Sequence, residues 1–166
     1  MRLPKFFALF GLAALWPLAA QGAAWKTYHN DRFGTTADVP ANWRAGPPPE
    51  NDDGRVFTSP DGSAHITISG GLHIWDTVAE GMAMQEAGPP GATVTYRHRE
   101  AHTTTLSGTK GNLIFYEKHV LACHDQVWNS VYIDYPAARK KEIDPLVGHV
   151  VRSLRSGVSV QVKECP

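Results

Sequence analysis

Long apolar runs and an excess of charge of either sign are both missing from this chain of 166 residues. No apolar run approaches the roughly 20 residues of a membrane-spanning helix. Lysine plus arginine and aspartate plus glutamate number 16 each, so no surplus of positive charge is available for nucleic acid or acidic membranes. We therefore expect no nucleic-acid partner and no membrane span in the mature protein.

The sequence also lacks the short motifs that carry common chemistries. It has no Gly-x-Ser-x-Gly nucleophile turn, no His-Glu-x-x-His or Cys-x-x-Cys metal motif, and no phosphate-binding or dinucleotide-binding glycine pattern. We therefore expect no cofactor, and a non-enzymatic binding or accessory role is favoured over catalysis.

The N-terminal residues have the pattern of an export signal. Arg2 and Lys5 precede an apolar stretch over residues 6–15, and Pro17 then leads into small residues that end at Ala24. This pattern predicts a signal peptide over 1–24, a single globular domain over 25–166, and a periplasmic or secreted protein.

Only two cysteines are present, Cys123 and Cys165. In the oxidising compartment that export implies, an even number of cysteines indicates a disulfide. One intramolecular pairing exists, and it would tie the C-terminal tail to the body of the domain by closing a loop of about 40 residues.

The remaining pattern predicts an α+β domain. Short extended segments are expected at 26–29, 35–39, 55–59 and 64–69, then a helix at 75–87, whose residues Thr77 and Glu80 have capping-box spacing. Four further strands follow at 93–99, 101–107, 112–122 and 126–134. A last helix is expected to begin at 136 and to restart at Asp144, with Pro145 in its first turn. The fold class is thus a mostly antiparallel sheet of about six to seven strands with helices packed on it.

Several turn and strand-start motifs resemble those of small exported bacterial proteins with the PsbP/Mog-like fold. They are YHNDRFG (28–34), DVPA (38–41), ENDDGR (50–55), FTSPDG (57–62) and YPAA (135–138). The resemblance covers most of the mature chain and implies an α/β/α sandwich used for binding and assembly rather than catalysis. It carries no catalytic residue to this sequence.

Aromatic and proline residues supply the candidate binding surface. Trp43 precedes Pro47, Pro48 and Pro49, and an aromatic ring beside a stiff proline run is typical of an exposed recognition element; the alternative is that Trp43 holds the loop down. Trp128 and Tyr132 share one face of a strand, where they line either the core or a partner surface. We expect the partner to be another envelope or extracellular protein; the sequence leaves the oligomeric state open.

Two alternatives of other classes remain. His98, His102, His119 and His124, the last beside Cys123, could form a metal site if the strands bring them together. A hydrolase site could form only in three dimensions, and Ser69, His73 and Asp76 are its nearest candidates.

Overall fold

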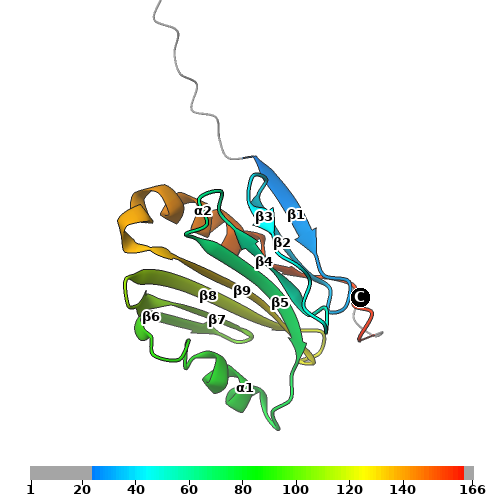
Figure 1. Cartoon of the computed structure of the whole chain (residues 1–166). Coiled ribbons are helices and arrows are strands. Elements are labelled where there is room, and N and C mark those ends of the chain that lie inside the picture. Colours follow the sequence, from blue (N-terminus) through cyan, green and yellow to red (C-terminus); the bar gives the residue numbers. More distant parts are fainter. Residues whose placement is uncertain (1–23, 163–166) are drawn as a thin grey trace, which may run out of the picture.

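The computed structural model describes residues 24–162, and its central element is one large antiparallel sheet (Figure 1). Its seven strands lie in the order β3-β4-β5-β9-β8-β7-β6. Their bounds are Arg44–Ala45 (β3), Gly54–Thr58 (β4), His65–Leu72 (β5), Val127–Pro136 (β9), Leu113–Ala122 (β8), Thr103–Lys110 (β7) and Thr93–Glu100 (β6). The predicted α+β class is therefore confirmed, and the sheet has the upper number of strands expected.

A second, three-stranded sheet joins the two ends of the described chain. It contains β1 (Trp25–His29), β2 (Thr35–Pro40) and β10 (Arg155–Ser156) in the order β1-β2-β10. The hydroxyl of Thr35 donates to Oδ1 of Asn129 at 2.7 Å, which links this small sheet to the centre of the large one. The sequence pattern predicted strands β1 and β2 but not their separation from the large sheet.

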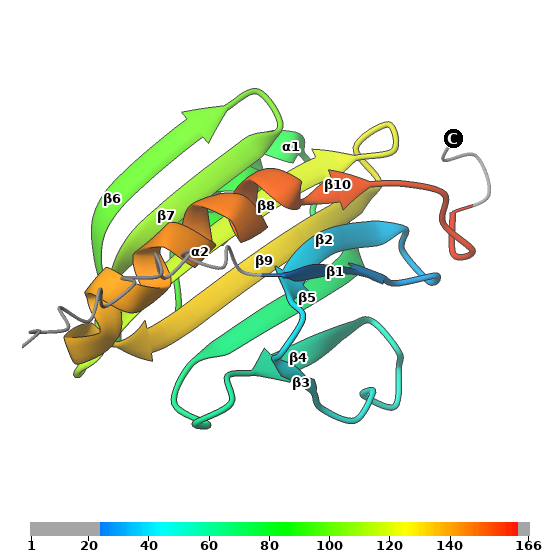
Figure 2. The same ribbon diagram turned by 90° about the horizontal axis from the view of Figure 1, so that it is seen from above.

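The small sheet and helix α2 (Lys140–Ser153) cover the same face of the large sheet (Figure 2). Alternate side chains of β5 and β9 point to that face, as the period of two in a strand requires. These side chains are buried against α2 and β2. This main core includes Ile66, Ile68, Val131, Ile133, Tyr135, Ile143, Val147 and Val150, with Ala37 and Val39 from β2.

Helix α2 is continuous where a restart was predicted. A short 3-10 turn, η1 (Ala137–Arg139), leads directly into it, and Pro145 is its sixth residue. Pro145 lies beyond the first turn, so it removes the amide that would bond to the Lys141 carbonyl, and the helix nevertheless continues to Ser153. Asp144 is not an N-cap: its carboxylate accepts from the hydroxyl of Tyr135 and the ammonium of Lys140.

Helix α1 (Val78–Gln85) lies on the opposite face and is much shorter. The predicted capping box is present: Thr77 Oγ1 accepts from the Glu80 amide, and the Glu80 carboxylate accepts from the Thr77 amide. The helix buries Met82 against Trp128 and Leu121 in a second, smaller core. No helix within residues 24–162 is both long and apolar enough to cross a membrane.

The turn between β8 and β9 places three consecutive non-glycine residues in the left-handed region. Cys123, His124 and Asp125 have φ values of 58°, 51° and 64°. Cys165 lies outside the described residues, so its pairing with Cys123 stays a prediction.

Glycine adopts such a conformation without the steric cost of a side chain. We expect His124→Gly to raise the free energy of unfolding by about 1 kcal/mol and the melting temperature by about 3 °C. The matched control is His98→Gly, since His98 is also exposed but lies within strand β6. There the same change is expected to destabilise by about 0.5 to 1 kcal/mol. Calorimetry on both variants checks the prediction; destabilisation of similar size in both would contradict it.

Candidate functional site

The face of the large sheet that carries α1 is only partly covered. Among the side chains of β5 and β9 that face α2, Ile68 is 0% exposed and Ile133 is 1% exposed. Their neighbours on the other face, such as Ser69 and Tyr132, are half-buried and polar. Polar, partly exposed side chains on the central strands of a seven-stranded sheet mark a surface that the fold has not used for its core.

We call this surface the trough. One row of paired residues crosses its floor, from Val56 to Thr67, Tyr132 and Glu117 on strands β4, β5, β9 and β8. A hollow of about 350 Å³ lies at the β4 end, with the prolines at 47–49 as its wall. A second hollow of about 330 Å³ lies at the β8 end, and its walls include Met84, Pro89 and Pro90 from the end of α1 and the segment after it. Both hollows share one floor, so the trough is an elongated surface.

A buried histidine lies beside the floor, between a hydroxyl and a carboxylate. His119 is 6% exposed, and its Nδ1 lies 2.7 Å from the hydroxyl of Ser130 on the neighbouring strand. Its Nε2 is 3.1 Å from Oε1 of Glu117, but the two atoms are not aligned as a hydrogen bond. The other carboxylate oxygen, Oε2 of Glu117, is buried and accepts no hydrogen bond from the described residues.

This Ser130, His119 and Glu117 arrangement has the residue types of a nucleophile, a base and an orienting acid. Acyl transfer also needs free donors that stabilise a developing oxyanion. Strand β9 is paired along its length with β5 on one side and β8 on the other, so the backbone amides around Ser130 donate into these ladders. The arrangement is thus better suited to holding a charged or polar ligand than to catalysing acyl transfer.

Tyr132 lies at the middle of the floor. Burial, together with the nearby carboxylates of Asp134 and Glu117, raises the pKa of its hydroxyl to about 12. The hydroxyl therefore stays protonated at neutral pH, and its hydrogen bond is directed toward the carboxylate of Asp134. Asp134 itself is bound by Nδ1 of His65 at 2.8 Å.

Trp128 shares a strand face with Tyr132, but it is part of the core. It is 4% exposed. Its ring is surrounded by His73, Trp75 and His119, with ring centroids 5.9, 6.4 and 6.4 Å away. Of the two interpretations of Trp128, the structure therefore favours an anchor for α1 over a binding residue.

The prediction that Trp43 forms an exposed patch with the prolines is wrong. Trp43 is 4% exposed and packs in the main core, while Pro47, Pro48 and Pro49 are exposed. The Trp43 amide donates to the Pro40 carbonyl at 3.0 Å, and the indole belongs to the core cluster that contains Phe57 of β4 and Ile143 of α2. Trp43 thus has the anchoring role that was the alternative.

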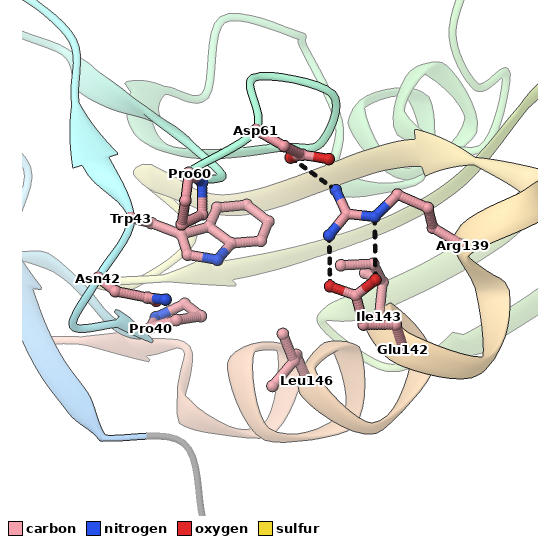
Figure 3. Close-up of a pocket in the computed structure, with 9 residues that line it drawn as sticks. All are labelled: Pro40, Asn42, Trp43, Pro60, Asp61, Arg139, Glu142, Ile143 and Leu146. Atoms are coloured by element: carbon pink, nitrogen blue, oxygen red, sulfur yellow. Dashed lines mark hydrogen bonds and ion pairs between the residues drawn. The ribbon is translucent and has the colours of Figure 1, made fainter.

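The inner edge of Trp43 lines a separate pocket of about 320 Å³ (Figure 3). Arg139 is the cation of this pocket, and its guanidinium is already bound by Asp61 at 2.8 Å and by both oxygens of Glu142. Asp61 also accepts from Ser59 and Ser63, and these hydrogen bonds hold the pKa of its carboxyl well below its usual range. Because the Arg139 guanidinium already binds two carboxylates, this pocket is a weaker candidate than the trough.

The four histidines of the predicted metal site are not brought together. Strand β6 ends at Glu100, so His102 lies in a turn instead of on the face of His98. His98 contacts Glu100 at 3.3 Å, His102 contacts Asp125 at 3.0 Å, His119 lies beside the trough and His124 is exposed. Among residues 24–162 no three histidine, cysteine or acidic side chains are grouped so as to hold a metal.

Ser69, His73 and Asp76 do not form a catalytic set either. Ser69 lies on the floor of the trough opposite Ser130. His73 lies against Gly81 of α1 and beside the ring of Trp75, and Asp76 is exposed. The structure therefore places Ser69, Tyr132, His119 and the three prolines around one surface, and adds Glu117 and Ser130, which sequence reasoning did not identify.

Comparison with known proteins confirms the PsbP/Mog-like fold. No protein-family model and no curated protein matches the sequence. The solution structure of cyanobacterial PsbP (CyanoP) from Synechocystis sp. PCC 6803 is similar with a TM-score of 0.59 and 13% identity, covering 86% of this chain and 99% of that one. The crystal structure of the Ran-binding protein Mog1p from Saccharomyces cerevisiae is similar with a TM-score of 0.54 and 11% identity, covering 87% and 100%. At these identities the likeness concerns the fold alone.

Proposed function

We propose that this protein is an exported, non-enzymatic binding factor that receives a segment of another envelope or extracellular protein in the trough. The observation that carries the proposal is the contrast between the two faces of β5 and β9. On one face Ile66, Ile68, Val131 and Ile133 are buried and apolar. On the other face Thr67, Ser69, Ser130 and Tyr132 are polar and half-buried, and a wall bounds this surface at each end.

The dimensions of the trough support a peptide segment as its occupant. Successive strands in a sheet lie about 4.8 Å apart, so a floor that crosses four strands extends for about 15 Å. An extended segment of about four or five residues spans that length. The exposed side chain of Val56, at 42%, offers apolar contact at one end of the floor. The Ran-binding neighbour shows that this fold can serve protein recognition.

Site-specific cross-linking tests this function. A photoreactive phenylalanine analogue placed at Val56, in the full chain expressed in its own source, is expected to form a discrete cross-linked product with another protein. The control carries the same analogue at Lys141, an exposed position of α2 outside the trough. Equal products from both positions, or no product from Val56, would count against the proposal.

The hydrolase alternative is now specific enough to test separately, because Ser130 lies 2.7 Å from His119. An active serine hydrolase reacts covalently with a fluorophosphonate probe through its nucleophile. We expect no labelling of the purified protein. Labelling that is lost in Ser130→Ala would replace the binding proposal by a catalytic one.

A further inference from the structure

The hollow at the β8 end of the trough has an acidic floor and apolar walls. Glu117 and Tyr132 form the floor, while Met84, Pro89 and Pro90 are among the residues that form the walls. We call this hollow the Glu117 pocket. We propose that it binds the ammonium or guanidinium group of a lysine or arginine side chain of the partner, an inference that rests on the proposed function and specifies its chemistry.

The first argument is the carboxylate itself. Glu117 is 16% exposed at its side chain, and its Oε2 accepts no hydrogen bond from residues 24–162. A largely buried carboxylate oxygen without a donor is costly, so such groups normally have partners. The carboxylate that carries this oxygen also lines the Glu117 pocket.

The second argument is the buried imidazole behind the carboxylate. The side chain of His119 is 7% exposed, and its Nε2 faces Oε1 of Glu117 at 3.1 Å without a hydrogen bond. Its other nitrogen is fixed by Ser130. The imidazole therefore lies against Oε1 of Glu117, while the same carboxylate lines the Glu117 pocket.

The third argument concerns the nearby cations, which are already engaged. Arg99 Nε binds Oε1 of Glu86 at 2.8 Å, and Arg97 donates to the Glu86 carbonyl. No lysine or arginine nitrogen of the described residues lies within 4.0 Å of the Glu117 carboxylate. Among residues 24–162, only His119 approaches this carboxylate, at Oε1, so Oε2 is left for a donor from a bound partner.

The walls select the kind of donor. A lysine or arginine side chain has an aliphatic stem, which packs against apolar groups while its charged head finds an acceptor. Met84 and the prolines match the stem, and the acceptor oxygens of the Glu117 carboxylate match the head. A metal ion would need further ligands, and no group of three suitable side chains occurs in residues 24–162.

Peptide titration followed by amide chemical shifts tests the assignment. The probes are acetyl-Gly-Ser-Lys-Ser-Gly-amide, its arginine counterpart, and a counterpart with norleucine, which keeps the stem and removes the charge. We expect the two basic peptides to shift the amides of Gly88, Glu117 and Tyr132, and the norleucine peptide to leave them unchanged. Glu117→Gln should weaken binding of the basic peptides about tenfold, whereas Glu100→Gln, at an exposed position of β6, should not.

Stability separates a binding role from a structural one. Because Oε2 of Glu117 accepts no hydrogen bond within residues 24–162, Glu117→Gln is expected to leave the melting temperature unchanged or raise it. A lowered melting temperature, unchanged peptide affinity, or equal binding of the norleucine peptide would overturn the assignment. If Val56 still cross-links a partner in any of these cases, the binding function stands and only the Glu117 pocket is rejected.

Discussion

Replacing Gly70 by alanine is expected to lower the free energy of unfolding by about 3 kcal/mol, at the upper end of the usual cost of overpacking. A β-carbon at this position would lie 2.3 Å from Cβ of Phe33 and 2.5 Å from Oγ1 of Thr35. Both contacts are too short, and both atoms belong to the region where the small sheet packs on the large one. The substitution therefore forces the two sheets apart.

The adjacent glycine is the matched control. A β-carbon on Gly71 would have no neighbour within 4 Å, although the two residues share strand β5. Gly71→Ala is expected to be neutral or to stabilise by about 0.5 kcal/mol, because glycine within a strand carries an entropic cost. Urea denaturation of both variants measures the difference. Similar midpoints for the two would show that the sheets do not pack as described.

Trp128→Ala is the second change with a large expected effect. The indole is enclosed by His73, Trp75 and His119 and contributes to the only core cluster described beneath α1. Its removal leaves a cavity, and we expect a loss of about 3 to 5 kcal/mol in the free energy of unfolding. Urea denaturation followed by far-ultraviolet circular dichroism measures this loss.

The control for Trp128 is Ile74→Ala, in the segment that leads to α1. Ile74 is 79% exposed, and its truncation should change stability by no more than about 0.5 kcal/mol. If Trp128→Ala kept its stability and lost cross-linking from Val56, Trp128 would be a binding residue and the core interpretation would be wrong.

Local patterns predicted most of the elements because their causes are local. Thr77 and Glu80 are three residues apart, and the capping box formed as that spacing indicates. The restart at Asp144 failed because tertiary contacts outweighed a local signal: Tyr135 and Lys140 engage the carboxylate that would have capped the helix. The burial of Trp43 likewise depends on distant elements, β4 and α2, that no short window of sequence contains.

The candidate site was predicted only in part, because its residues come from strands that are distant in the sequence. Tyr132 and Ser69 were singled out, but Thr67 pairs with Tyr132, which lies 65 positions later in the chain. A signal for Glu117 and His119 was present. These two polar residues are two positions apart, so they share one face of strand β8, between the apolar residues Phe115 and Leu121 of that face. Polar side chains on one face of a central strand indicate that part of this face is exposed. Which residues of other strands lie beside them depends on the order of the strands in the sheet.

The small sheet has a consequence for the order in which the molecule can form. Its strand β2 pairs with β1 near the start of the described chain and with β10 near its end, where Gly157 donates to the Gly34 carbonyl at 2.9 Å. A chain delivered from its N-terminus, by a ribosome or across a membrane, presents β1 and β2 long before β10 and α2 arrive. Contacts of such large sequence separation close late and slow folding. The β1–β2 hairpin therefore lacks the cover of α2 and the pairing with β10 until almost the whole polypeptide has emerged. During that interval its apolar side chains are exposed, and a chaperone that binds unfolded chains would protect them.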